Sequence, residues 1–203
     1  MRGRFITFEG IDGSGKTTIA HRVAAELRRK GLKVVLTTEP TRSWLGDAVK
    51  RSYDDDVGPV AETFLFLADR ARHTEDIRAW LKAGKTVISD RYADSTYAYQ
   101  GARLEGVVGN PLGWLRSVSA PAIIEPDLTI LLEISPAKGL RRISGRAKKV
   151  RFETLRFLTK VARNYDRLAR TRRWVRIDAT MPANDVTREA LAVIERRIGA
   201  SGR

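Results

Sequence analysis

The chain has 203 residues and a mass of 22.8 kDa, and 42% of its residues are hydrophobic, which is enough apolar material for a folded core. It contains no cysteine and two histidines, which excludes disulfides, thiol catalysis and cysteine-based zinc sites and argues against a Ser-His-Asp hydrolase. Its formal net charge of +14 indicates attraction to polyanions. No apolar run approaches the roughly 20 residues of a membrane span and no signal peptide is recognisable, so we expect a cytoplasmic protein without a membrane anchor.

Short apolar runs alternate with amphipathic stretches along the chain, which is typical of an α/β fold. We expect strands at residues 4–9, 33–38, 86–90, 127–134 and 174–178. Helices are predicted at residues 16–30, after Ser43, and at residues 60–82, 114–119, 136–146, 151–172 and 182–198. The rest of segment 91–126 has a mixed pattern. Because no repeat and no linker interrupts this order, we expect a single domain over residues 1–203.

The strongest motif is GIDGSGKT at residues 10–17, which fits G-x-x-x-x-G-K-[ST] between a predicted strand and a predicted helix. Glycines let the backbone curl so that successive N–H groups point at phosphate oxygens, and the helix N-terminus adds its positive end. In such a P-loop, Lys16 would reach the β- and γ-phosphates and Thr17 would bind Mg²⁺. The predicted nucleotide site therefore comprises Gly10, Ile11, Asp12, Gly13, Ser14, Gly15, Lys16, Thr17 and Thr18.

A P-loop predicts nucleotide binding but leaves three classes open: a nucleotide-dependent switch, an ATP-driven motor and a kinase for a small acceptor. The third predicted strand ends in Asp90, a carboxylate suited to the Mg²⁺ shell. Arg91 follows it, where a motor ATPase often has a glutamate, and arginine cannot act as a base. The chain also lacks the Asn-Lys-x-Asp element of guanine-specific switches. These features favour phosphoryl transfer to an anionic acceptor that Arg91 would bind.

Several further motifs follow the P-loop in a set order: Glu39-Pro40, then FLADR at 66–70, DRY at 90–92, AYQG at 98–101 and PDLT at 126–129. Together with the P-loop and a helix carrying Arg163 and Tyr165, they resemble the thymidylate kinase family over nearly the whole chain. The resemblance implies a P-loop kinase fold, a five-stranded parallel sheet with helices on both faces. It implies ATP and Mg²⁺ as cofactors, dTMP as acceptor and dTDP as product. It also implies a homodimer formed through helices, for which residues 60–82 and the segment after Arg91 are candidates.

The same resemblance assigns roles in the acceptor site. Phe66 would stack on the base, and Arg70, one helical turn later, would bond the base edge. Arg91 would clamp the acceptor phosphate. Tyr99 would lie against the sugar and favour deoxyribose, and Asp12 would contact the sugar 3′-OH. The other residues expected to bind the acceptor are Glu39, Thr96 and Gln100.

The basic stretch at residues 141–152 corresponds, by the same resemblance, to the lid that covers ATP. Because the P-loop lacks the arginine that some members carry there, we expect the lid to supply this charge, with Arg146 as first choice and Arg142 and Arg151 as alternatives. Thr38 stands where many members have an arginine that contacts the acceptor phosphate, and Arg42 is the candidate to replace it.

Two alternative functions stay open. A kinase for dUMP or dCMP would share every phosphate contact and differ only at the base pocket. The high positive charge suggests a nucleic-acid-stimulated P-loop ATPase, although the basic residues are scattered along the chain rather than gathered in one tail. We therefore expect no requirement for nucleic acid, magnesium ligands at Thr17 and Asp90, and a catalytic set of Asp12, Lys16, Arg91 and Arg146.

Overall fold

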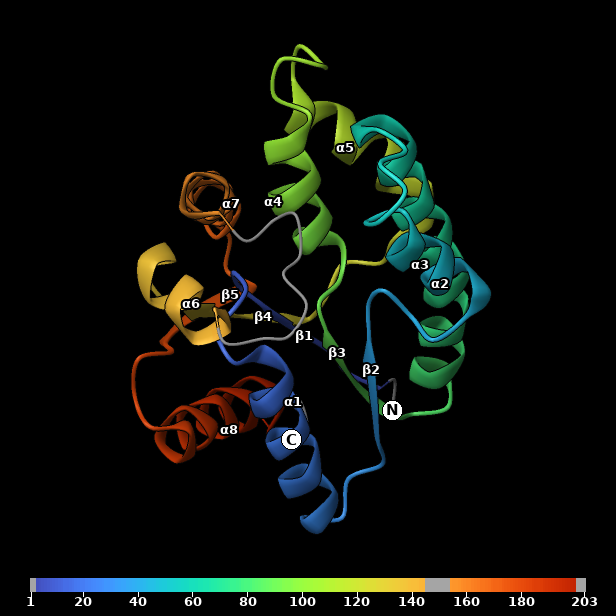
Figure 1. Cartoon of the computed structure of the whole chain (residues 1–203). Helices are drawn as coiled ribbons and strands as arrows, with labels where there is room; N and C mark the ends of the chain where they lie inside the picture. Colours follow the sequence, from blue (N-terminus) through green and yellow to red (C-terminus); the bar gives the residue numbers. More distant parts are fainter. Residues whose placement is uncertain (1–2, 145–153, 200–203) are drawn as a thin grey trace.

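The computed structural model describes residues 3–144 and 154–199. A five-stranded, all-parallel sheet runs through its middle in the order β2-β3-β1-β4-β5 (Figure 1). The strands are β1 (Phe5–Glu9), β2 (Val34–Thr38), β3 (Thr86–Asp90), β4 (Leu128–Glu133) and β5 (Trp174–Asp178). The predicted α/β class and parallel sheet are confirmed, and each strand lies within one residue of its predicted ends.

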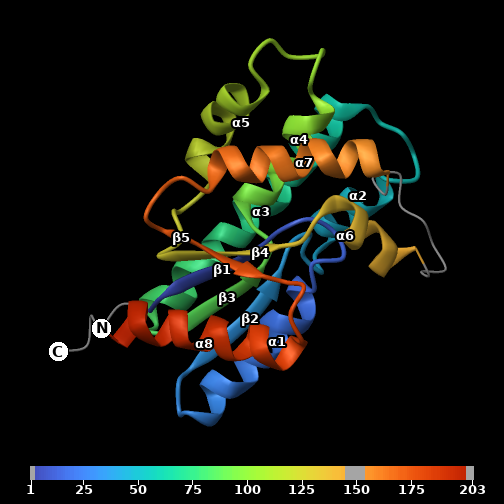
Figure 2. The same cartoon turned by 90° about the vertical axis from the view of Figure 1, so that its left-hand side faces the viewer.

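Helices cover both faces of this sheet (Figure 2). On one face, α1 (Lys16–Arg29) packs against α8 (Ala183–Gly199). On the other side lie α2 (Trp44–Arg51), α3 (Pro59–Lys82), α4 (Ala93–Arg103), α5 (Pro111–Ser119) and α7 (Leu155–Leu168), with the short 3-10 helix η1 (Ala120–Ala122) after α5. Helix α6 (Pro136–Ile143) follows β4 at the edge of the sheet where the strands end. No helix in the described part of the chain is long and apolar enough to cross a membrane.

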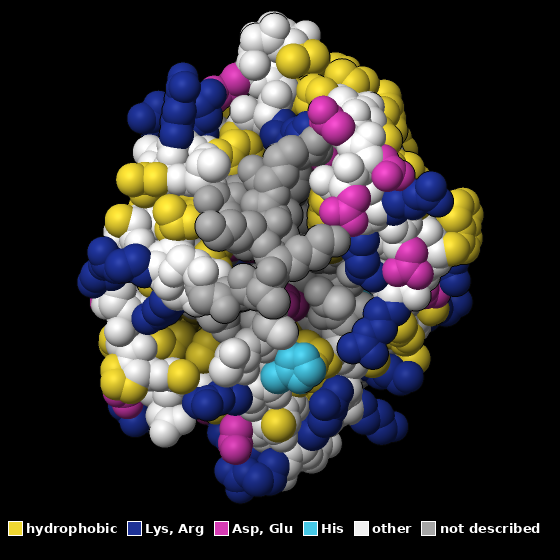
Figure 3. All heavy atoms as spheres, in the orientation of Figure 1, with side chains coloured by type: hydrophobic (Ala, Val, Ile, Leu, Met, Phe, Trp, Pro, Cys, Tyr) yellow, Lys and Arg dark blue, Asp and Glu magenta, His cyan; other side chains and the backbone are white. Residues whose placement is uncertain are grey.

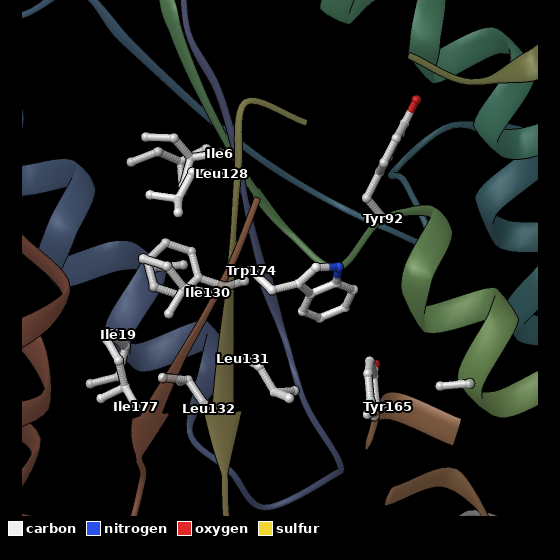
Figure 4. Close-up of a cluster of buried hydrophobic side chains, with 14 of the residues drawn as sticks. Ile6, Ile19, Tyr92, Leu128, Ile130, Leu131, Leu132, Tyr165, Trp174 and Ile177 are labelled. Carbon is white, nitrogen blue, oxygen red and sulfur yellow. The ribbon is translucent and has the colours of Figure 1, made fainter. Parts of the chain in front are cut away.

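The apolar core lies on both faces of the central strands. In β4, Leu128, Ile130 and Leu132 point toward α1 and α8, whereas Leu131 points toward Tyr165 of α7 (Figure 4). All five of these side chains are buried. Because helices cover both faces, residues 130–132 of this strand form a continuous apolar run instead of alternating with polar residues.

The largest difference from the sequence prediction is α4, which lies in the segment that carried no clear pattern. Ten consecutive residues of this helix, 93–102, are buried. A helix enclosed on all sides has no polar outer stripe, so its sequence lacks the amphipathic period. Its buried polar side chains include three that belong to the candidate site, namely Ser95, Thr96 and Gln100.

Several helix ends also differ from the prediction, and three of them are informative. Helix α5 begins three residues earlier, because the side chain of Asn110 caps it by accepting from the Gly113 N–H at 3.1 Å. Helix α7 ends at Leu168 instead of residue 172, since the chain turns before Trp174 to enter β5. Helix α6 ends at Ile143, and most of the predicted lid and the predicted start of the next helix at residue 151 lie outside the described residues.

Candidate functional site

The predicted P-loop connects β1 to α1 at the edge of the sheet where the strands end. Gly13 and Gly15 have φ angles of 83° and 88°, which L side chains rarely adopt. A side chain at Gly13 would also clash with α6, because its Cβ would lie 2.2 Å from the carbonyl oxygen of Gly139. Gly15 immediately precedes α1, so the N-terminus of that helix opens into the loop. The loop therefore has the backbone geometry of an anion-binding cradle.

The side chain of Lys16 folds back over this loop. Its Nζ donates to the carbonyl oxygen of Ile11 at 2.9 Å and lies 3.4 Å from the hydroxyl of Ser14. Burial, followed by the charge of Arg91, lowers the pKa of Lys16 from 10.5 to about 8, and nearby carboxylates such as Asp12 only partly oppose this. A phosphate bound in the loop would supply the opposite charge that stabilises the ammonium form.

Thr17 and Asp90 meet where α1 begins and β3 ends. The hydroxyl of Thr17 donates to Asp90 Oδ2 at 2.5 Å. The other oxygen of Asp90, Oδ1, is buried and has no hydrogen-bond partner among the described residues. Within residues 3–144 and 154–199, no cluster of three or more carboxylate or imidazole side chains could hold a metal ion. Mg²⁺ fits this arrangement, because it is usually bound by one or two carboxylates together with substrate phosphates and water.

Arg91 follows Asp90 with a φ of 73°, the left-handed region that is strained for a residue other than glycine. Its guanidinium pairs with the carboxylate of Asp12, donates to the hydroxyl of Ser95 at 3.2 Å and lies 5.2 Å from the centre of the Tyr99 ring. The Tyr99 hydroxyl accepts from the Asp12 N–H at 2.9 Å. Although burial opposes the charge, Asp12 raises the pKa of Arg91, so the guanidinium stays protonated beside the P-loop.

Glu39, just after β2, forms a buried ion pair with Arg70 of α3. Nε and Nη2 of Arg70 both donate to Glu39 Oε2, at 2.9 and 2.6 Å. His73 Nδ1 donates to the other oxygen, Oε1, at 2.8 Å. Burial would raise the pKa of Glu39, but Arg70 and His73 together lower it, so the carboxylate is ionised. This pairing holds Arg70 with its Nη1 buried and without a hydrogen-bond partner in the described part of the chain.

Two further buried polar atoms lie on α4, which packs against α3. Thr96 Oγ1 and Gln100 Oε1 have no hydrogen-bond partner in residues 3–144 and 154–199. These residues are four apart, so they share one face of the helix. Nε2 of Gln100 donates to Glu62 at 3.3 Å. Because buried polar groups are normally paired, these unpaired atoms at expected acceptor-binding residues are available to bind a ligand.

Phe66 lies outside the apolar core of the described residues. It is half-buried, and its ring centre is 6.3 Å from that of Tyr53. Beside Asp90, a cleft of about 580 Å³ is lined by residues that include Thr38 and Arg42. The hydroxyl of Thr38 donates to the Asp90 carbonyl oxygen at 3.0 Å, so it contacts the backbone of the predicted metal ligand.

The predicted lid residues Arg146 and Arg151 lie outside the described residues. Arg142 is described, and its Nη1 donates to the carbonyl oxygen of Ala179 at 2.9 Å and to that of Gly13 at 3.4 Å. It therefore lies beside the P-loop, although no contact of its own assigns it a role in catalysis.

Sequence reasoning missed three side chains of this site. Tyr53 stands near Phe66, and His73 completes the Glu39 pair. Glu9 is a fully buried carboxyl at the end of β1 and accepts three hydrogen bonds. For Glu9 a signal was present, since an acidic residue that ends a buried apolar strand just before a P-loop is unusual.

The fold and site together define a class. A P-loop joins the first strand and helix of a parallel sheet, and its threonine bonds an aspartate at the end of the neighbouring strand. Arg91, the residue after that aspartate, lies beside the loop, and its guanidinium can bind a second anionic molecule. This is the arrangement of a P-loop kinase.

Comparison with known proteins specifies the family. Residues 8–190 match the family model described as thymidylate kinase. A probable thymidylate kinase of Natronomonas pharaonis is 44% identical over 194 residues, covering 94% of this chain and 96% of that protein. The probable thymidylate kinase of Methanosarcina barkeri is 43% identical over 198 residues, covering 96% of this chain and 97% of that protein. The chain belongs to the thymidylate kinase family and is a phosphotransferase of the nucleoside monophosphate kinase type.

Proposed function

We propose that the protein transfers the γ-phosphoryl group of ATP to dTMP, giving dTDP and ADP. The observation that carries this proposal is the set of unpaired buried atoms on α3 and α4: Arg70 Nη1, Thr96 Oγ1 and Gln100 Oε1. Thymine offers an acceptor at O4 and a donor at N3–H on one edge. A donor from Arg70 and an acceptor from Gln100 complement that edge, and the hydroxyl of Thr96 can do either.

The donor nucleotide would lie with its phosphates over residues 10–18. The backbone N–H groups and the start of α1 favour negative charge there, and Lys16 would exchange its contact with the Ile11 carbonyl for phosphate oxygens. Thr17 and Asp90 would hold Mg²⁺, which when bound neutralises charge on the β- and γ-phosphates. The protein's own contribution is to align the phosphates and to keep the surrounding charges in place.

The acceptor phosphate would lie opposite, on Arg91. In the described structure the carboxylate of Asp12 pairs with this guanidinium, which marks the position as one that binds an anion. A phosphate monoester has a second pKa of about 6 and is largely dianionic at neutral pH, so the transfer needs no general base. We propose that Asp12 contacts the sugar 3′-OH once the phosphate has taken its place on Arg91. Tyr99, whose ring faces the guanidinium of Arg91, would border the deoxyribose.

We propose that the lid arginine at position 146 stabilises the charge of the transferring phosphoryl group, as arginines do in related transfers with effects up to about 10³–10⁵ in rate. The lid would also exclude water, which would otherwise hydrolyse ATP. Arg142 supports a lid near this place, because it reaches from α6 to the carbonyl of Gly13. Alanine variants at 142, 146 and 151, compared for kcat, distinguish the three arginines.

A kinase for dCMP or dUMP is the nearest alternative. Cytosine carries an amino group where thymine has O4, so it would place a donor against the donor of Arg70, and we expect strong rejection of dCMP. Uracil lacks only the methyl group, a difference that apolar pockets discriminate by about 10- to 200-fold at most. We therefore expect dUMP to be the better of the two alternative substrates.

A nucleic-acid-stimulated ATPase is disfavoured by the distribution of charge. On the face seen in Figure 3, lysine and arginine side chains are scattered around the rim, with acidic side chains among them. A nucleic-acid footprint normally has basic residues clustered on one face. We propose that the enzyme needs no nucleic acid and works in the cytoplasm, where both of its proposed substrates occur.

We propose that the enzyme is a homodimer that uses α3. Phe64 of α3 is 51% exposed and packs edge-on against Trp114 of α5, with ring centres 5.8 Å apart. Exposed aromatic groups of this kind often mark protein–protein contacts. Light scattering of the wild-type protein and of Phe64→Glu tests this, and a monomeric wild-type protein at micromolar concentration would contradict it.

ADP release measured for dTMP, dUMP, dCMP and dGMP with Mg-ATP tests the reaction. We expect the highest kcat/KM with dTMP and a selective loss for dTMP in Arg70→Gln. ATP hydrolysis without any monophosphate, stimulated by DNA or RNA, would instead support the ATPase. Equal rates with all four monophosphates would refute the base pocket assigned to α3 and α4.

A further inference from the structure

Glu9 is a buried carboxyl that the proposed chemistry does not use. It is the last residue of β1, and its relative exposure is 0%. Its Oε1 accepts from the Tyr92 N–H at 2.8 Å, and its Oε2 accepts from the hydroxyls of Ser95 at 2.6 Å and Tyr165 at 2.8 Å. One side chain thus connects the P-loop strand to the turn before α4, to α4 itself and to α7.

Ser95 links this carboxyl to Arg91. A serine hydroxyl has one proton, and Ser95 donates it to Glu9, so the oxygen presents its lone pairs elsewhere. Nη1 of Arg91 donates to that oxygen at 3.2 Å. The guanidinium is therefore oriented on one side by the P-loop carboxylate of Asp12 and on the other by Ser95, which Glu9 holds.

The backbone of Arg91 needs the same support. A residue other than glycine at a φ of 73° persists only where neighbouring contacts hold it there. The Arg91 N–H donates to the Phe8 carbonyl oxygen at 3.0 Å, and the next N–H along the chain, that of Tyr92, donates to Glu9. Two successive residues of β1 thus fix the two successive N–H groups of this turn.

We propose that Glu9 is a positioning residue for the acceptor phosphate, acting through Ser95 and the Tyr92 N–H to hold Arg91 opposite the P-loop. This inference rests on the proposed role of Arg91 in binding the acceptor monophosphate. Reacting groups must be held within a fraction of an ångström, and a misplacement of about 1 Å can cost on the order of 100-fold in rate. Glutamine has nearly the same shape as glutamate, but one of its two terminal atoms is a donor. Because three donors converge on the ionised carboxylate of Glu9, Glu9→Gln must break at least one of these contacts, and the kinetics are therefore measured above pH 7, where the wild-type carboxyl is ionised.

The test is the kinetics of Glu9→Gln and Ser95→Ala, run with the monophosphate that the wild-type enzyme turns over fastest. We expect kcat/KM for that monophosphate to fall by about 10- to 100-fold in Glu9→Gln and by a smaller factor in Ser95→Ala. The KM for ATP should stay within about twofold of wild type, since the P-loop keeps its own contacts. A comparable rise in the KM for ATP and in the KM for the monophosphate would overturn the inference.

Thr7→Val is the matched control for general damage to the sheet. Thr7 is a buried polar residue two positions earlier on β1, and its hydroxyl pairs with Thr129, away from Arg91. We expect this variant to lose thermal stability while it keeps the wild-type KM for the monophosphate. If Thr7→Val raises that KM as much as Glu9→Gln does, the effect of Glu9 is not specific and the inference fails.

A double-mutant cycle separates positioning from direct action. In an Arg91→Ala background, Glu9→Gln should have little further effect on kcat/KM, because the residue that it positions is absent. If the effects of Glu9→Gln and Arg91→Ala on kcat/KM are fully additive, the inference is overturned. If Glu9→Gln does not fold, the cycle with Ser95→Ala decides, because that change breaks the link between Glu9 and Arg91 while it leaves the carboxyl of Glu9 in place. If the wild-type enzyme phosphorylates no monophosphate, the proposed function fails, and a crystal structure of Ser95→Ala then tests the inference by whether Arg91 keeps its contact with Asp12.

Discussion

Arg70 of α3 donates two hydrogen bonds to one oxygen of Glu39, and both side chains are almost completely buried, at 1% and 3% exposure. A buried ion pair adds little net stability, because both charges lose their hydration. Removing one partner is nevertheless strongly destabilising, since it leaves an uncompensated charge inside the protein. The same pairing directs the remaining nitrogen of Arg70, which has no partner among the described residues. Stability and acceptor recognition are therefore coupled at this pair.

Glu39→Gln is expected to lower the free energy of unfolding by about 3–5 kcal/mol, because Arg70 keeps its charge but loses its carboxylate. The KM for dTMP should rise in the same variant, since Arg70 is released from its orientation. Denaturant unfolding and steady-state kinetics measure the two effects. Glu133→Gln is the control. Glu133 pairs with Arg176 at the surface, where the two side chains are 42% and 37% exposed, respectively. Loss of this pair should lower the free energy of unfolding by less than about 1 kcal/mol. Equal losses of unfolding free energy in Glu39→Gln and Glu133→Gln would contradict the burial of the Glu39–Arg70 pair.

Gly13→Ala is expected to lose most ATP binding and to destabilise the fold. The added Cβ would meet the Gly139 carbonyl at 2.2 Å, and alanine is strained at a φ of 83°, so the P-loop and α6 must separate. Calorimetric titration with ATP and a thermal melt measure this. Gly109→Ala is the control, because nothing lies within 4 Å of a Cβ at that exposed position. Unchanged ATP affinity in Gly13→Ala would show that the loop does not bind phosphate in this conformation.

ATP binding is expected to take up a proton at mildly alkaline pH. The pKa of Lys16 without ligand is about 8, lowered by burial and by Arg91, so at about pH 8.5 most molecules carry a neutral amine there. The triphosphate should raise this pKa again by supplying opposite charge. Titration calorimetry in two buffers with different ionisation enthalpies detects the uptake as a difference in observed heat. Lys16→Arg should bind ATP without this proton uptake. Identical heats for the wild-type enzyme in both buffers would refute the prediction.

The stability of the fold is expected to fall between pH 4.5 and pH 7 because of Glu9. Burial, followed by the charge of Asp94, raises the pKa of this carboxyl from 4.5 to about 7. The hydrogen bonds from Ser95 and Tyr165 oppose this rise. In this window the folded chain holds a proton that the unfolded chain has released, so the free energy of unfolding decreases as the pH rises. The accumulated change is about 3 kcal/mol.

Unfolding curves of the wild-type protein and of Glu9→Gln across this pH range measure the effect as a difference. Glutamine does not titrate, so the variant should gain stability relative to wild type by about 3 kcal/mol between pH 4.5 and pH 7. Thr7→Val, which adds and removes no titratable group, should follow the wild-type profile. A constant difference between Glu9→Gln and wild type over this range would show that Glu9 does not titrate there.

The strands and the P-loop were predictable because their signals are local. A run such as that of β4 is apolar on both faces wherever a parallel sheet is covered on both sides, and glycines with a lysine and a threonine at the right spacing determine a phosphate loop. Helix α4 was not predictable in the same way. Its residues between Ala93 and Ala102 are buried on every side by elements from distant parts of the chain, so no local period reveals the helix.

The sequence by itself determined the position of the predicted phosphate-binding loop between β1 and α1, with its lysine, the aspartate that ends β3 and the arginine after it. The tertiary structure alone decided how the arginines are held. Arg70 reaches Glu39 across 31 positions of the chain and Ser95 reaches Glu9 across 86, and no local pattern can encode a contact at such separations. The physical reason is burial: a charged side chain removed from water must find partners, and which partners are near depends on how the strands and helices pack.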